Sequence, residues 1–158
     1  MWVAVDPGSV RTGVAACDRG EVLASPVATL TKAEAVTGVV AIVQEREAVG
    51  VVVGLPISLS GAEGESARLA RSYALELAAA LLVPVYLVDE RLTSVAAGAA
   101  LQAGGHTTRS ARRVVDQAAA AALLQGVLDA RVAGGHECGT VLSGGLGERV
   151  IPTEGGEQ

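Results

Sequence analysis

The sequence predicts an α/β domain built on a mixed, five-stranded sheet, and three observations support this prediction. Val-rich runs of strand length come first, and later runs alternate with segments in which apolar residues recur at helical spacing. Half of the residues are hydrophobic but only 2% are aromatic, so Val, Leu and Ala must form a core of sheet packed against helices. A length of 158 residues suits one domain.

The first three predicted elements are short strands. We expect them at residues 2–5, 13–18 and 22–27, with Arg19-Gly20 as a tight hairpin turn between the second and the third. Strands joined by such short connections pair with each other, so this part of the chain should form a three-stranded antiparallel meander.

The pattern then changes to alternating helices and strands. Thr31 and Glu34 have the spacing of a capping box, which predicts a helix that begins there and continues to about Arg46. Strands at residues 48–53 and 85–88 are separated by a helix and should therefore be parallel. The other predicted elements are a loop at residues 54–64 and helices at about 65–82, 93–103 and 109–133.

Residues 134–158 differ in composition from the rest. They are rich in Gly, Glu and Thr and have no sustained hydrophobic period, apart from Val141-Leu142 and Val150-Ile151. We therefore expect one domain at residues 1–133 and a Gly-rich, flexible tail at residues 134–158.

Three acidic residues lie where a buried carboxylate is hard to justify without a cation. Asp6 and Glu90 each follow a predicted strand directly, and the carboxyl ends of parallel strands meet at one edge of a sheet. Asp116 lies in the last helix, where Ala120 and Leu123 place it on the core side. A turn role or a local pair with an arginine explains each residue alone, but the three together favour a site.

The order of elements and four motifs give a closer identification. The order β-β-β-α-β-α-β-α, with acids after the first and fifth strands and on the last helix, indicates the ribonuclease H-like fold. The motifs resemble those of the YqgF family, in the same order, over about residues 1–130. They are Asp6-Pro7-Gly8 with Arg11-Thr12-Gly13-Val14, Val53-Gly54-Leu55-Pro56 with Gly61, Asp89-Glu90-Arg91-Leu92-Thr93-Ser94, and Val115-Asp116-Gln117-Ala118-Ala119.

The resemblance implies a nuclease. YqgF proteins are known as pre-16S rRNA nucleases and as Holliday-junction-resolvase-like proteins, so we expect hydrolysis of phosphodiester bonds in maturation of the 5′ end of pre-16S ribosomal RNA. Carried over by motif, Asp6, Glu90 and Asp116 match the family's metal-binding, catalytic acids. Ser58 stands where relatives often have Asn, and the stretch before the last acid is rich in Arg rather than Lys. Neither departure removes a ligand.

The expected cofactor follows from the ligand chemistry. Carboxylates without Cys or a paired His select hard cations, so we expect Mg²⁺ or Mn²⁺, with two ions sharing Asp6. Two such ions, roughly 4 Å apart, can activate a water and stabilise the leaving oxygen of a phosphodiester.

Nucleic acid is the expected partner, but the charge restricts where it can bind. A formal charge of −5 argues against a general nucleic-acid binder and requires a local basic surface. Arg11 and Arg91 stand next to the acids, and Arg109, Arg112 and Arg113 lie in the first turns of the last helix. Bound phosphate explains cations at a helix start, and a solvated helix end explains them equally well.

Three other functions remain open from the sequence. A Holliday-junction resolvase of the related fold usually has a second acid three residues after the helix Asp, where this chain has Ala119. A sugar-kinase or actin-like ATPase also begins with an Asp-x-Gly turn, but one domain of this length lacks the second lobe that encloses ATP. A non-catalytic factor that contacts ribosomes or the transcription machinery would lack metal-dependent cleavage.

Residues outside the motifs indicate the expected cellular compartment and the mode of RNA recognition. Cys17 and Cys138 show no CxxC spacing, and no charged segment precedes an apolar one at the start, so we expect an untargeted, cytoplasmic protein without membrane association. With so few aromatic residues, recognition of RNA should depend on backbone and shape. Precursor ribosomal particles are expected partners of a monomer or homodimer.

Overall fold

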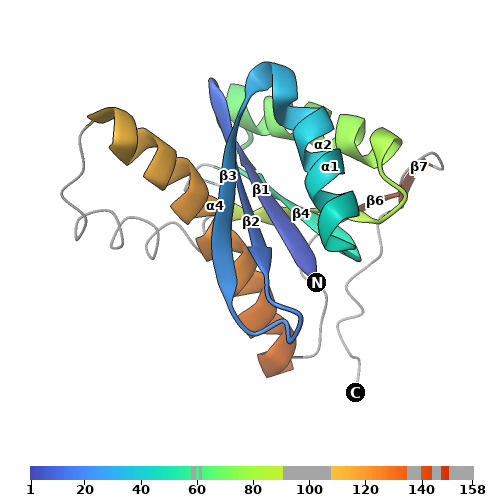
Figure 1. Cartoon of the computed structure of the whole chain (residues 1–158). Coiled ribbons are helices and arrows are strands. Elements are labelled where there is room, and N and C mark those ends of the chain that lie inside the picture. Colours follow the sequence, from blue (N-terminus) through green and yellow to red (C-terminus); the bar gives the residue numbers. More distant parts are fainter. Residues whose placement is uncertain (58–59, 61, 91–107, 135–139, 144–146, 150–158) are drawn as a thin grey trace.

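In the part of the chain that the structure describes, seven strands form one sheet at the centre of the molecule, and helices cover both of its faces. The computed structural model describes residues 1–57, 60, 62–90, 108–134, 140–143 and 147–149; at both ends of the last helix and in the last two strands it describes the backbone alone. The strand order is β3-β2-β1-β4-β5-β6-β7. Helices α1 and α2 lie on one face and α4 lies on the other (Figure 1).

The predicted antiparallel meander is confirmed. It consists of β1 (Trp2–Pro7), β2 (Arg11–Cys17) and β3 (Ala24–Thr31), and β2 pairs antiparallel with both of its neighbours.

The connection between β2 and β3 is longer than predicted. Arg19-Gly20 does form the turn centre, because the N–H of Glu21 donates to the carbonyl of Asp18 at 3.1 Å. The Asp18 carboxylate then accepts N–H groups from the next two residues, at 2.8 and 3.3 Å, and delays the start of β3. These bonds also hold the pKa of Asp18 below its ordinary value.

The capping box is also confirmed. The N–H of Thr31 donates to the Glu34 carboxylate at 3.3 Å, and a 3-10 turn, η1 (Lys32–Glu34), leads into α1 (Ala35–Arg46). Helix α1 ends at Glu47, which has the left-handed φ of 53°.

The alternating part of the fold matches the predicted order. It contains β4 (Gly50–Leu55), α2 (Glu65–Ala80), β5 (Val85–Asp89) and α4 (Thr108–Gly134). Strands β1, β4 and β5 are parallel, as predicted, although β4 begins two residues later than expected. The helix predicted at residues 93–103 lies outside the described residues.

Two strands extend the sheet beyond the five that the sequence predicts. Strands β6 (Thr140–Ser143) and β7 (Gly147–Arg149) pair antiparallel with β5 and with each other. They lie in the segment predicted to be a Gly-rich, flexible tail, and the division into a domain at residues 1–133 and this tail stays a prediction. Val141-Leu142, the apolar pair noted in the sequence, lies in β6.

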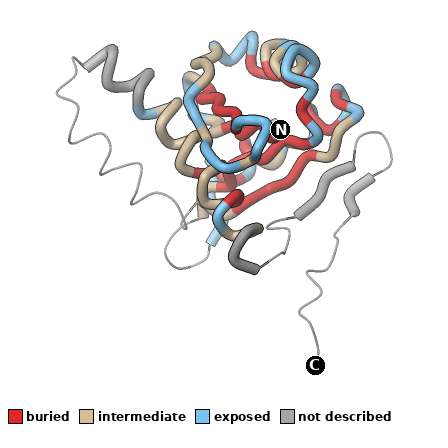
Figure 2. Tube along the Cα trace, turned by 60° about the horizontal axis from the view of Figure 1, so that its bottom comes forward, coloured by how far each residue is buried: buried red, intermediate tan, exposed pale blue. Residues whose placement is uncertain are grey.

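Successive side chains along each strand point to opposite faces of the sheet, so the core has two layers. Figure 2 marks the buried residues in red. In β1, Val3 and Val5 pack toward α1 and α2, whereas Trp2 and Ala4 pack toward α4. Because Asp6 continues the even-numbered series, it belongs to the α4 face. None of the helices in the described part of the chain combines the length and hydrophobicity needed to span a bilayer.

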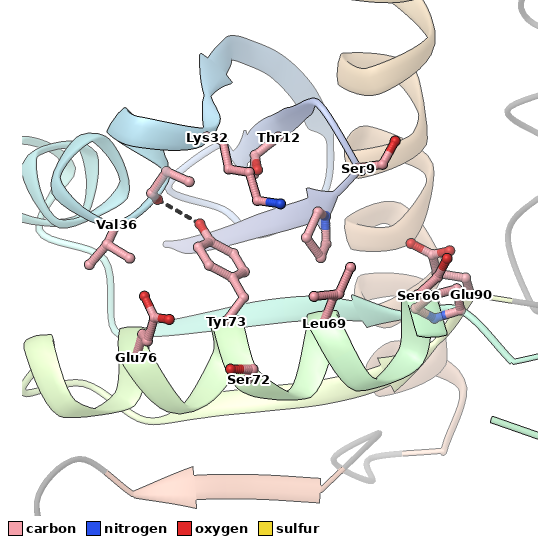
Figure 3. A pocket seen from close by; sticks show the side chains of 14 residues that line it. Ser9, Thr12, Lys32, Val36, Ser66, Leu69, Ser72, Tyr73, Glu76 and Glu90 are labelled. Carbon is pink, nitrogen blue, oxygen red and sulfur yellow. Dashed lines mark hydrogen bonds between the residues drawn. The ribbon is translucent and has the colours of Figure 1, made fainter. Parts of the chain in front are cut away.

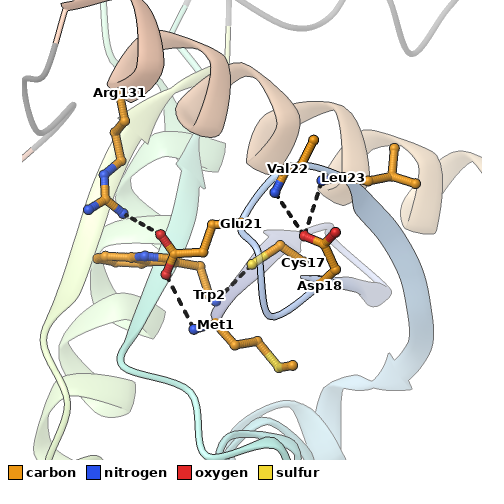
Figure 4. A network of polar contacts seen from close by, with 8 residues as sticks. All are labelled: Met1, Trp2, Cys17, Asp18, Glu21, Val22, Leu23 and Arg131. Carbon is orange, nitrogen blue, oxygen red and sulfur yellow. Dashed lines mark hydrogen bonds and ion pairs between the residues drawn. The ribbon is translucent and has the colours of Figure 1, made fainter.

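Two of the contacts that hold helix α4 against the sheet lie far apart along the helix. Near its start, a Cβ atom on Gly13 would lie 1.9 Å from the carbonyl oxygen of Asp116, so only glycine permits this approach. Near its end, the Arg131 guanidinium lies 4.8 Å from the Trp2 ring and 3.7 Å from the Glu21 carboxylate (Figure 4). The two contacts fix how α4 lies across the sheet.

We expect Gly13→Val to destabilise the protein by about 3 kcal/mol or more, because the new side chain overlaps the backbone of α4. Thermal and urea unfolding followed by circular dichroism measure the loss. Gly64→Ala is the matched control, since nothing lies within 4 Å of its added Cβ. Equal unfolding midpoints for the two variants would contradict the close approach.

Candidate active site

Asp6 lies at the carboxyl end of β1, on the face covered by α4. Its cross-strand partner in β2 is Gly13. On the other side, Val5 pairs with Val53 of β4, so the next residue of β4 beside Asp6 is Gly54. Asp6 is half-buried and has a glycine on each neighbouring strand, which leaves space beside its carboxylate.

Glu90 follows β5 and uses the space at Gly54. A Cβ atom on Gly54 would lie 2.4 Å from Oε1 of Glu90, so the missing side chain lets this carboxyl group reach over β4 toward Asp6. Burial, followed by hydrogen bonding to Asp6 and the charge of Asp6, raises the pKa of Glu90 to about 9. Without a cation, the protonated form of Glu90 is therefore favoured beside Asp6.

Asp116 approaches the same place from α4. Its carboxylate Oδ2 lies 3.6 Å from Nε of Arg11, and both side chains are 24% exposed. Burial raises the pKa of Asp116, Arg11 opposes this shift, and the charge of Asp6 adds to it. The negative charge of Asp6 thus disfavours ionisation of Asp116, and the ion pair with Arg11 favours it.

The three acids meet only in part. Asp6 and Glu90 touch, as their strand-end positions predict, and Gly13 brings the backbone of Asp116 beside Asp6. Among the described residues, however, no three His, Cys, Asp or Glu side chains form a ready metal-binding group. The predicted cluster of three carboxylates around one ion is thus not assembled here, and the ligand roles of all three stay a prediction.

The donor set nevertheless fits a divalent cation. Asp6 and Glu90 offer only oxygen atoms, which Mg²⁺ and Mn²⁺ prefer. The raised pKa of Glu90 shows that a second negative charge beside Asp6 is unfavourable in this half-buried place. A divalent ion would compensate the two like charges and favour the ionised form.

The structure describes the side chain of only one of the five predicted basic residues, Arg11. Arg11 lies in β2 and contacts Asp116. Arg109, Arg112 and Arg113 lie in the first turns of α4, where the backbone alone is described, and Arg91 lies outside the described residues. Asp116 therefore has an ion-pair partner in β2, whereas the alternative pair with Arg112 or Arg113 lies outside the described side chains.

Two hollows adjoin the acids, one on each side of the turn between β1 and β2. Gly8 and Ser9 of this turn line both. The smaller, of about 320 Å³, is also lined by Arg11 and Asp116. The larger, of about 470 Å³, contains Glu90 at one end and extends along α2 (Figure 3).

Sequence reasoning missed the roles of the two glycines beside Asp6. Gly13 and Gly54 entered only as parts of motifs, whereas the structure shows that they admit α4 and Glu90. A glycine inside a strand often marks a close approach, so both were detectable signals. The larger hollow also had a signal, since Ser66, Leu69 and Tyr73 have the spacing of one helical face.

The comparisons with known proteins agree on the family. A family model described as "RuvX: Holliday junction resolvase" matches residues 1–130. A relative from Kineococcus radiotolerans is 48% identical over 93% of this chain and 80% of its own length. Another from Frankia casuarinae is 51% identical over 82% of this chain and 66% of its own length. Both are named "Putative pre-16S rRNA nuclease".

A solved structure confirms the predicted fold. Thermus thermophilus RuvC, in complex with a Holliday junction substrate, superimposes with a TM-score of 0.59 over 87% of this chain and 99% of that one, at 14% identity. The shared architecture is the ribonuclease H-like α/β fold.

We expect Glu90→Gln to stabilise the metal-free protein at pH 8, by on the order of 2 kcal/mol. The folded state binds the Glu90 proton more tightly than the unfolded state, whose pKa is near the ordinary 4.5. Its contribution is therefore complete below pH 4.5 and is lost as the pH rises toward about 9. The Gln side chain cannot ionise.

Thermal unfolding in EDTA from pH 5 to pH 9 measures this effect. The melting temperature of the wild type should fall more steeply with pH than that of Glu90→Gln. Glu45→Gln, at an exposed position of α1, is the control. Parallel profiles for wild type and Glu90→Gln would show that folding does not raise the pKa of Glu90.

Proposed function

The chain belongs to the RuvX family, also called YqgF, and from this premise we propose that it is a metal-dependent nuclease that matures the 5′ end of pre-16S ribosomal RNA. One observation carries the proposal: Gly54 and Gly13 let Glu90 and the backbone of Asp116 approach the end of β1 at Asp6, beside two hollows that Glu90 and Asp116 line. A buried pair of carboxyl groups is costly for a fold and useful for binding cations. The names of the relatives supply the substrate.

Asp6, Glu90 and Asp116 are the proposed catalytic acids and metal ligands. When bound, Mg²⁺ or Mn²⁺ activates a water and neutralises charge on the phosphate. Asp6 is central, since it touches Glu90 and its charge acts on Asp116. Arg11 holds Asp116 to one side, so binding of a cation is expected to compete with this ion pair.

Contact with nucleic acid is assigned to a local basic surface. Arg11 lines the smaller hollow beside Asp116. Arg91, Arg109, Arg112 and Arg113 are proposed to continue this surface, on the grounds of their sequence positions next to the acids and at the start of α4. Phosphates can then approach a protein of formal charge −5 from one side.

A second candidate function is cleavage of Holliday junctions. The description of the family model and the fold shared with RuvC favour it. The chain has Ala119 where related resolvases usually place a further acid, which favours RNA as the substrate. Precursor ribosomal particles in the cytoplasm are the proposed setting.

We expect Asp6→Asn to abolish cleavage, with a loss of at least about 100-fold, because it removes the charge shared among the acids. The amide is nearly isosteric, so the melting temperature should not fall. Purified protein is assayed with pre-16S RNA, single-stranded RNA and four-way DNA junctions, with and without Mg²⁺ or Mn²⁺. The preferred substrate distinguishes the two candidate functions.

Asp129→Asn is the matched control for this experiment. Asp129 is an exposed carboxylate of the same protein, on α4 and away from both hollows. Its variant should cleave like the wild type. Cleavage by Asp6→Asn at the wild-type rate, or cleavage that persists in EDTA, would reject the proposed mechanism.

We expect simultaneous replacement of Arg112 and Arg113 by Ala to weaken binding to all nucleic acids alike. Loss of two phosphate contacts should also reduce the slope of log affinity against log salt by about one to two. Salt-titrated binding without divalent metal measures both quantities. An unchanged affinity and slope would place the contact surface elsewhere.

A further inference from the structure

The larger hollow reaches well beyond the acids. It begins at Gly8 and Glu90 and continues along α2 from Ser66 to Glu76 (Figure 3). Ten residues of helix span about 15 Å, so the hollow is much longer than a metal site requires. Its volume of about 470 Å³ lies in the range of small-molecule sites.

One wall of the hollow is apolar. Leu69 and Tyr73 project from α2, and Val36 projects from α1 on the opposite side. The Tyr73 hydroxyl donates to the carbonyl of Ala35 at 2.6 Å, which holds the ring in place between the helices. Leu69 remains 47% exposed although it is a large hydrophobic residue. This wall can pack against a flat, apolar group.

The remaining lining is polar and contains one cation and, at its two ends, the carboxyl groups of Glu76 and Glu90. Lys32 extends from η1 toward the hollow, and it is the only lysine of the chain. Among the described residues that line the hollow, it is also the only positively charged one. Hydroxyl groups of Ser66 and Ser72 supply further hydrogen-bonding atoms. An ammonium group near an apolar wall suits a ligand with a ring and a phosphate.

We propose that the larger hollow binds one unpaired nucleotide of the substrate strand, next to the phosphodiester that the acids cleave. The base packs against Leu69 and Tyr73, and a phosphate of the same strand contacts Lys32. Packing of a base on such a wall does not depend on which base it is. The inference rests on the proposed nuclease function and adds that cleavage occurs beside an unpaired nucleotide.

Leu69→Ala tests the apolar wall, and Leu75→Ala is its matched control. Both leucines lie on α2 and are similarly exposed, at 47% and 53%, but Leu75 does not line the hollow. Fluorescence anisotropy in EDTA measures binding of a short single-stranded RNA and of a blunt RNA duplex. Leu69→Ala should bind the single strand about fivefold more weakly and the duplex within about twofold of wild type. Leu75→Ala should change neither.

Lys32→Gln tests the phosphate contact, with Arg46→Gln in the last turn of α1 as the control. Lys32→Gln alone should reduce the salt dependence of single-strand binding, by about one unit of slope. Equal effects of Leu69→Ala on strand and duplex, or no effect on either, would overturn the proposal. Thermal unfolding confirms that each variant is folded.

Competition with free nucleoside monophosphates distinguishes a strand from a free nucleotide as the ligand. Monophosphates that bind wild type but not Leu69→Ala, with single-strand affinity unchanged, would assign the hollow to a free nucleotide and overturn the proposal as stated. The nuclease function is tested separately. If wild type cleaves in a metal-dependent way and Leu69→Ala binds like wild type, the hollow alone is rejected. If no substrate is cleaved but the single-strand effect appears, the nuclease function alone is rejected.

Discussion

The approach of Glu90 to Asp6 across Gly54 is the constraint on which the rest of the site depends. Two carboxyl groups come together in a half-buried place only because the neighbouring strands have no side chains there, at Gly13 and Gly54. The same two gaps admit α4 on one side and Glu90 on the other. The arrangement is held by the packing of the whole sheet, which is why distant segments contribute one acid each.

The two hollows give the carboxyl pair two different surroundings. On the α4 side, Arg11 and Asp116 form a charged surface that suits a sugar-phosphate backbone. On the α2 side, Leu69, Tyr73 and Lys32 form a longer and more apolar one. A strand that crosses the turn between β1 and β2 would therefore meet a different chemistry before and after the acids. Such asymmetry gives the site a direction along its substrate.

Local signals in the sequence were sufficient for most of the fold. The ends of β1 and β5 placed Asp6 and Glu90 at one edge, and the Thr31–Glu34 spacing located the start of the first helical segment. Features that depend on tertiary contact were not predictable in the same way. Asp116 pairs with Arg11, about a hundred residues away, and this contact arises from the packing of α4 on β2, which sequence spacing does not reveal. Strands β6 and β7 are only four and three residues long, too short for a clear period.

The contacts that Asp116 and Arg131 make with the sheet fix the number of helical residues between them. Asp116 and Arg131 are separated by fifteen residues, or about 22 Å of helix, and each is matched to a fixed feature of the sheet, Gly13 and Trp2. One inserted residue between them would turn one end by about 100° relative to the other. Point substitutions on the outer surface of α4 leave this phase intact, whereas insertions or deletions cannot. The outer surface of α4 should therefore vary freely in composition, whereas the number of residues between its two contacts should hardly vary at all.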